Sequence, residues 1–202
     1  MTRNNRRVIK KGQIWISAVL YIALGVVAIT IVLSAGVPVI NKMKDKNTII
    51  QTRDILLSLD NVIREVRDEG TGSRRVISPF TIKGGNMFFK DDENKIVWDM
   101  KTKVVFVQPC TKINSDRKGC EDDKLLIKEG PVELYETKTI VEEEYVMHLE
   151  LNFNDVAFLV VKEGIGKNAP LLGKYNLKIE NKGIDENRDP QTNLPDIELS
   201  LS

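Results

Sequence analysis

The sequence has 202 residues, with 30 Lys and Arg against 29 Asp and Glu, one His, two Cys and 42% hydrophobic residues. Residues 1–12 contain five basic and no acidic residues, residues 13–40 contain no charge, and the remainder has a net charge of −4. This composition excludes an intrinsically disordered chain, and the slightly acidic body argues against a nucleic-acid partner. The length allows one domain plus an appendage.

An uncharged run of 27 residues extends from Ile14 to Ile40. As an α-helix it is about 40 Å long, whereas the hydrocarbon core of a bilayer is about 30 Å thick. A core helix of a soluble domain keeps a polar stripe, so the run predicts a membrane-spanning segment. Basic residues flank it on both sides, so charge alone does not set its orientation. A secretory signal removed near Ser34 and an uncleaved single-span anchor are the alternatives.

The helix is expected to continue beyond this run and to cover residues 13–69, apolar over 13–40 and amphipathic over 41–69. Gly36 and Pro38 predict a bend or a locally melted stretch, because proline removes a backbone donor and clashes with the preceding turn. Gly70 and Gly72 are expected to end the helix. The apolar residues of its second part recur at three- and four-residue steps: Ile49, Ile55, Leu56, Leu59, Val62, Ile63 and Val66.

A specific junction precedes the apolar run. A basic leader ends in Lys10, Lys11 and Gly12, and Gln13 opens the helix. Together with the amphipathic continuation, this junction resembles the class III signal peptide of archaeal type IV pilins and archaellins. In that family a prepilin peptidase cuts after the glycine, so the resemblance implies removal of the leader, residues 1–12, with the two lysines as recognition charges. Ser17 stands where bacterial type IV pilins carry a glutamate, which favours the archaeal branch.

The resemblance implies a structural subunit of a cell-surface filament, used for adhesion or motility. Its partners are then other copies of itself in a helical homopolymer, a prepilin peptidase and the pilus assembly machinery. Before assembly, the precursor is held in the cytoplasmic membrane with its amino terminus inside. The residues expected to form the filament core are Ile14, Trp15, Ile16, Val19, Leu20, Ile22, Leu24, Val27, Ile31 and Leu33.

Two other functions fit the same sequence. One is a monomeric, single-span, membrane-anchored β-domain that binds a ligand or partner outside the membrane. The other is a non-filament pseudopilin, which shares the leader cleavage but is present at low copy number. The first differs from the filament subunit in keeping its leader, and the second in its abundance.

After Gly72 the hydrophobic period changes from helical to alternating, which predicts a β-rich head over residues 73–202. The alternation favours an antiparallel sheet with one solvated face, either a β-sandwich or a single curled sheet, and the fold class is α+β. Residues 91–94 are expected to form a hairpin connection. The amphipathic helix face is expected to pack on this sheet. The predicted strands are 86–90, 95–98, 103–107, 132–136, 144–153, 156–162, 175–179 and 196–201.

Cys110 and Cys120 enclose a short polar loop. If the head lies outside the membrane, a disulfide is favoured, because such an environment does not keep thiols reduced. Two reduced cysteines remain an alternative. A zinc site is disfavoured, since no companion ligands stand nearby in the sequence.

No cofactor, metal site or enzymatic activity is predicted. Asp185, Asn187 and Asp189 have the spacing of a calcium loop, but Pro190 stands where such a loop needs glycine, and a solvated acidic loop accounts for the pattern. The single histidine, His148, is expected to lie on the polar face of a strand, without a nucleophile or phosphate-binding loop in the sequence around it.

Overall fold

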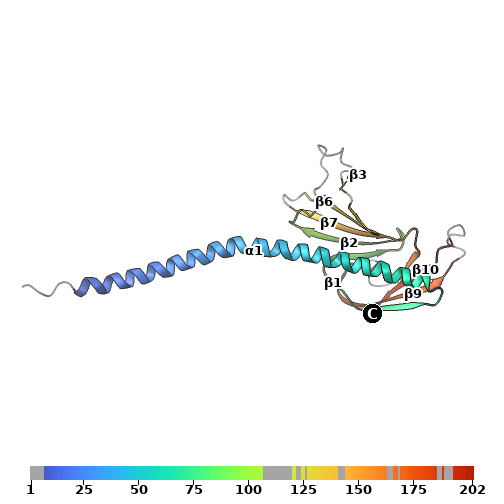
Figure 1. Cartoon of the computed structure of the whole chain (residues 1–202), viewed down its shortest axis with the longest axis horizontal. Helices are drawn as coiled ribbons and strands as arrows, with labels where there is room; N and C mark the ends of the chain where they lie inside the picture. The colour runs from blue at the N-terminus through green and yellow to red at the C-terminus, as the bar shows by residue number, and fades with distance from the viewer. Residues whose placement is uncertain are drawn as a thin grey trace, which may run out of the picture. The chain divides into compact units, whose positions relative to one another are not determined.

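The computed structural model describes residues 7–106, 120–121, 124–125, 127–140, 144–162, 166–167, 169–185, 188 and 193–202; of residues 7–14, 120–121 and 124–125 it describes the backbone alone. One helix is followed by strands, which confirms the α+β class (Figure 1). The chain forms two compact units, Met1–Lys44 and Asp45–Ser202. The second unit therefore contains the last part of the helix as well as every strand.

Helix α1 extends over Arg7–Asp68 and is 62 residues long. Pro38 lies inside it, and residues 36–38 are α-helical, so the melted stretch given above as one alternative is absent. The helix ends as predicted, with Gly70 and Gly72 at φ values of +90° and +86°. Glycine adopts this left-handed backbone without the steric cost that a Cβ imposes.

The end of α1 is fastened to the sheet by a buried asparagine. Asn181 is 2% exposed and donates from Nδ2 to the carbonyl oxygens of Val66, at 3.2 Å, and Arg67, at 3.3 Å. Its Oδ1 accepts from the backbone N–H of Gly183 at 2.8 Å. The last carbonyls of a helix have no partner within the helix, so this side chain supplies one from a distant strand.

In the described part of the chain, ten strands follow the helix. Eight form one sheet in the order β5-β6-β7-β2-β1-β9-β10-β8, and β3 pairs with β4 separately. All neighbours in the large sheet are antiparallel except β8 and β10, which are parallel. The strands are β1 Arg74–Lys90, β2 Lys95–Thr102, β3 Cys120–Glu121, β4 Lys124–Leu125, β5 Ile127–Glu129, β6 Val132–Lys138, β7 Tyr145–Asn152, β8 Phe158–Val161, β9 Leu171–Gly183 and β10 Asp196–Leu201. Of the two predicted arrangements, the structure has the single sheet.

The strand predicted at 103–107 is wrong over its described part. Residues 103–106 are not in a strand, because β2 already ends at Thr102. The Thr102 hydroxyl accepts from the backbone N–H of Val104 at 3.0 Å and donates to Asp45 Oδ2 at 3.0 Å. The local hydrogen bond from Val104 to the Thr102 side chain replaces pairing with a neighbouring strand, so β2 ends here. The apolar residues that follow nevertheless keep the alternation typical of a strand.

The predicted hairpin at 91–94 is confirmed. Lys90 and Lys95 are the last paired residues of β1 and β2, and Asn94 takes a φ of 52°. The Asn94 side chain is buried and donates to the carbonyl oxygen of Ala157 at 2.8 Å, while its oxygen accepts from the N–H of Leu159 at 2.7 Å. The turn is thus tied to the start of β8.

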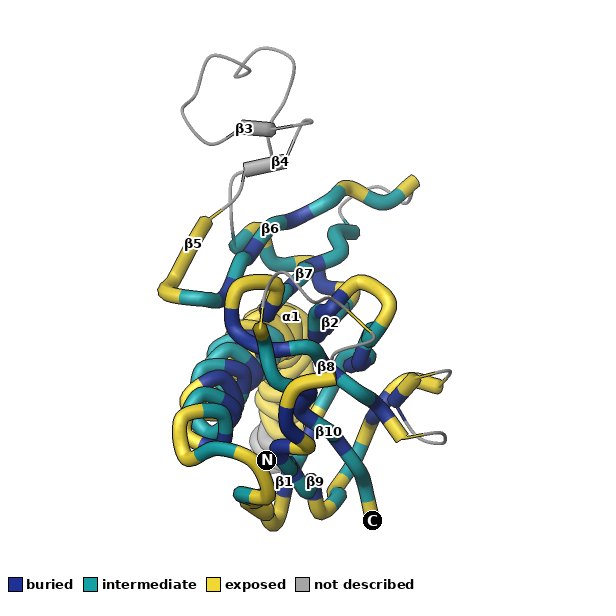
Figure 2. The backbone as a smooth tube through the Cα atoms, turned by 90° about the vertical axis from the view of Figure 1, so that its right-hand side faces the viewer, coloured by how far each residue is buried: buried dark blue, intermediate teal, exposed yellow. Residues whose placement is uncertain are grey.

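The core of the second unit lies where the amphipathic part of α1 meets the sheet (Figure 2). Leu56, Leu59 and Ile63 are completely buried, together with Trp98 of β2 and Leu149 of β7. This confirms that the predicted apolar helix face packs on the strands. Burying such side chains contributes about 1.5–3 kcal/mol each.

Close packing around Trp98 accompanies an irregularity in β1. The indole N–H donates to the carbonyl oxygen of Gly84 at 2.9 Å, and Gly85 takes a φ of +73°. A Cβ atom on Gly85 would lie 2.5 Å from the Trp98 ring. The β1–β9 pairing shifts register between Ile82 and Met87, so the glycine lies at an irregularity in the sheet.

Gly85→Ala is therefore expected to lower the free energy of unfolding by about 2–4 kcal/mol, because it adds overpacking to a disfavoured backbone conformation. Gly173→Ala is the matched control, since Gly173 has a φ of +119° but nothing within 4 Å of its Cβ position. Urea unfolding of both variants in detergent measures the difference. An equal loss in the two would contradict a clash with Trp98.

Candidate functional site

The apolar side chains of the first unit are exposed on every side of the helix. From Trp15 to Met43 the large apolar side chains retain 51–76% of their surface. Successive residues point about 100° apart around a helix, so consecutive exposed residues cover its whole circumference. Burial of each such side chain is worth about 1.5–3 kcal/mol, so this surface requires lipid or protein around it. The helix is long and apolar enough to serve as a membrane anchor.

The ten residues predicted for the filament core fall in this surface. Nine of them, from Trp15 to Leu33, are at least 55% exposed, and the side chain of Ile14 is outside the described residues. They do not form a single stripe. Consequently several neighbouring helices can pack against this surface at once. A helix that pairs with a single partner needs only one apolar stripe.

Two hydroxyls within this surface, those of Thr30 and Ser34, bond to the helix itself. Thr30 Oγ1 donates to the carbonyl oxygen of Val26 at 2.8 Å, and Ser34 Oγ donates to that of Ile31 at 2.9 Å. A Cβ added at Gly25 or Gly36 would meet nothing within 4 Å. A helical neighbour or a lipid chain therefore meets hydroxyls that already have an acceptor, and small residues over which helices pack closely.

The predicted processing residues, Lys10 to Gln13, lie within α1, and their side chains are outside the described residues. Cleavage between Gly12 and Gln13 thus stays a prediction. The charged flank on the other side is described. Lys42, Lys44 and Lys46 are exposed, and Asp45, between the last two, bonds to Thr102 in the sheet.

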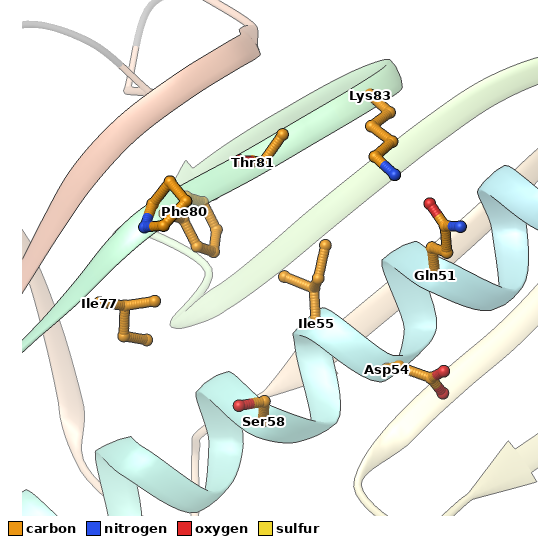
Figure 3. A pocket seen from close by; sticks show the side chains of 9 residues that line it. Gln51, Asp54, Ile55, Ser58, Ile77, Phe80, Thr81 and Lys83 are labelled. Carbon is orange, nitrogen blue, oxygen red and sulfur yellow. The ribbon is translucent and has the colours of Figure 1, made fainter.

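A shallow groove of about 300 Å³ lies between α1 and β1 (Figure 3). Ile55 of the helix and Ile77 and Phe80 of β1 line it. The first part of β1, Arg74–Ile82, pairs with β9 on one side, whereas β2 pairs only with Asn86–Lys90. Among the described strands, none pairs with the other edge of that first part, which is why the groove is open.

The other concentration of chemical groups is on the solvent side of the sheet, around His148 of β7. Its Nδ1 lies 2.6 Å from Asp99 Oδ1 of β2, and its Nε2 lies 2.9 Å from Thr137 Oγ1 of β6. The imidazole stacks on the Tyr135 ring, with centroids 4.6 Å apart and an 18° angle between planes. Tyr135 donates to Glu150 Oε1 at 2.6 Å. Burial of Tyr135, with this hydrogen bond to Glu150, raises the pKa of its hydroxyl.

The alternating pattern of β7 predicted His148 on a polar strand face, but not its partners. Asp99, Thr137 and Tyr135 are on other strands, and register alone brings them together: His148 stands opposite Asp99 on one side and Tyr135 on the other. Alternation within β7 shows which face a side chain occupies. It carries no information about the residue opposite.

A cluster of ion pairs borders this face at the β1–β2 hairpin. Glu93 contacts Lys90 and Lys95 at 2.6 Å each, and these hydrogen bonds hold the pKa of Glu93 at about 2. Lys95 also lies 3.3 Å from Glu150. Such exposed pairs orient side chains but add little stability.

The predicted disulfide and the calcium-like spacing lie largely outside the described residues. Cys110 is not described, and for Cys120 the structure gives only its backbone, in β3. Asn187 and Asp189 are likewise not described. No three His, Cys, Asp or Glu side chains converge as a metal site in the part of the chain that is described.

In comparisons with known proteins, no family model matches the chain, and neither curated proteins nor solved structures yield a match.

Proposed function

We propose that this protein is a structural subunit of an archaeal type IV pilus-like surface filament. The observation that carries the proposal is the apolar helical surface of the first unit, exposed all round, with the hydroxyls of Thr30 and Ser34 bonded within the helix. The junction Lys10-Lys11-Gly12-Gln13, immediately before this surface, supports leader removal by a prepilin peptidase. The head then stays outside the membrane.

Assembly exchanges lipid contact for protein contact. Lipid tails are as apolar as leucine, so the gain comes from close packing between helices and not from removing apolar surface from water. Open-ended growth needs a heterologous interface, in which different faces of one subunit meet successive neighbours. A helix that is apolar on every face provides such interfaces, whereas a helix with one apolar stripe forms closed pairs.

The partners in this proposal are other copies of the chain, the membrane before assembly, the peptidase and the assembly machinery. Nucleic acid is not among them, in keeping with the net charge of −4 after residue 40. The filament is located at the cell surface and serves adhesion or motility.

Gly12→Val is expected to block removal of the leader, because it places a branched side chain at the proposed cut. Gly25→Ala, in the same helix with nothing near its Cβ position, is the matched control and leaves cleavage intact. Mass spectrometry of the amino-terminal peptide measures both. The unmodified protein should begin at Gln13 in purified filaments, and a peptide beginning at Met1 or Val37 would count against the proposal.

A second candidate is a monomeric membrane-anchored domain that binds a partner through its head. The groove between α1 and β1 favours it, since Ile55, Ile77 and Phe80 offer an apolar lining next to an unpaired strand edge. This candidate predicts that Gly12→Val changes nothing and that electron microscopy of sheared surface material finds no filament containing the head.

A further inference from the structure

We propose that Thr137 is an activated hydroxyl that accepts an acyl group from an activated ester or thioester, with His148 as the general base and Asp99 as a positioning residue. The inference concerns only the sheet and goes beyond the filament function. It rests on a chain of hydrogen bonds that joins the Asp99 carboxylate to the His148 imidazole at 2.6 Å and the imidazole to the Thr137 hydroxyl at 2.9 Å.

The direction of each hydrogen bond follows from the chemistry of the groups. An ionised carboxylate only accepts, so the Nδ1 that faces Asp99 carries the hydrogen. In the neutral imidazole Nε2 is then an acceptor, and the Thr137 hydroxyl donates to it. A base that already accepts the hydroxyl hydrogen is in position to remove it, and the carboxylate stabilises the imidazolium that results.

The imidazole is held in place from several sides. Its ring stacks on Tyr135, whose hydroxyl is fixed by Glu150. The His148 side chain is 19% exposed and that of Asp99 is 34% exposed, so both are partly shielded while the sheet face remains open. The positions come from paired strands, which hold side chains more precisely than loops do.

A cationic group lies in the neighbouring cross-strand row. Thr137 and Lys101 both stand opposite Val146, from β6 and β2 respectively. Two strand spacings put their backbones about 10 Å apart. The Lys101 side chain is 73% exposed and forms a long ion pair with Glu144 at 4.0 Å. Its flexible stem can leave this exposed pair and extend across Val146. Its ammonium would stabilise the oxyanion that develops on the donor's carbonyl oxygen when Thr137 attacks.

The chemical step is an ester exchange and needs no oxidant or reductant. Thr137 Oγ1 attacks the carbonyl carbon of the donor while its proton passes to His148 Nε2. The resulting tetrahedral intermediate loses the alkoxide or thiolate as its bond to the carbonyl carbon breaks. The imidazolium returns the proton to that leaving group, so the products are O-acyl-Thr137 and an alcohol or thiol. Each chain reacts once, since the step itself includes no hydrolysis.

The test uses the full-length chain in detergent micelles with p-nitrophenyl acetate as the donor. We expect about one p-nitrophenolate released per chain and acetylation of Thr137 in peptide mass spectrometry. His148→Gln and Asp99→Asn should each slow this acetylation by at least tenfold, because general-base catalysis contributes about 10²–10⁴. Thr137→Ser should retain it, and Thr137→Val should abolish it.

Thr139→Val is the matched control. Thr139 lies two residues after Thr137, just beyond the end of β6, and its hydroxyl donates to the carbonyl oxygen of Glu144 at 2.9 Å, so the variant should still be acetylated at Thr137. Circular dichroism establishes which variants are folded. If His148→Gln unfolds, the isosteric Asp99→Asn and the conservative Thr137→Ser still decide the test. Two results would overturn the proposal. One is acetylation that is confined to lysines. The other is a rate of Thr137 acetylation in folded Asp99→Asn that equals the rate in the unmodified chain.

Discussion

Leu24→Lys is expected to eliminate incorporation of this protein into filaments while the head remains folded. Leu24 is near the middle of the apolar segment and is 66% exposed. A lysine at the centre of a membrane helix costs about 2.5–3.5 kcal/mol for insertion. In a bundle the same ammonium would be buried without a partner, and this cost recurs in every subunit. The compact unit that contains the sheet begins at Asp45, so its folding does not depend on this position.

Electron microscopy of sheared surface material and immunoblots of membrane fractions measure the effect. Asn61→Lys is the matched control, because Asn61 is an exposed residue of the same helix within the second unit. It introduces the same charge without touching the apolar segment, and filaments should form. Normal filaments from Leu24→Lys would contradict a core built from this segment.

Leu59→Ala is expected to lower the free energy of unfolding of the head by about 2–5 kcal/mol, the range measured for buried leucines in other proteins. Leu59 is fully buried and belongs to the same cluster as Trp98 and Leu149. Domains of this kind have a total stability of about 5–15 kcal/mol, so the loss is a large fraction. The cost combines lost burial with the cavity that remains.

Urea unfolding followed by Trp98 fluorescence reports this loss directly, because the indole is buried in the same core. Ser58→Ala, at the adjacent exposed position of the helix, is the control and should change stability by less than about 0.5 kcal/mol. A similarly small change for Leu59→Ala would show that the helix does not depend on this contact with the sheet.

The helix and its docking face were predictable because their signals are local. Absence of charge over 27 residues and three- and four-residue spacing after Ile49 are properties of a single segment. The hairpin at 91–94 was predictable for the same reason, since four polar residues separate two apolar runs. In each case the residues that decide the structure are neighbours in the chain.

The first part of β1 was not predicted, although it is long. Pro79, Gly84 and Gly85 are residues that interrupt strands. Among the described strands, β9, about 100 residues later, is the one that pairs with Arg74–Ile82 and holds it in the sheet. The parallel pairing of β8 with β10 is likewise invisible in either strand alone. Tertiary partners here override local preference.

The chain's sequence alone determined that an apolar helix continues into an amphipathic one and that a β-rich head follows, because hydrophobic period and charge are written along one segment at a time. Only the tertiary structure decided that Asp99, Thr137 and Tyr135 surround His148. These side chains come from three strands, and their meeting depends on strand order and register, which arise from pairing between segments distant in the chain.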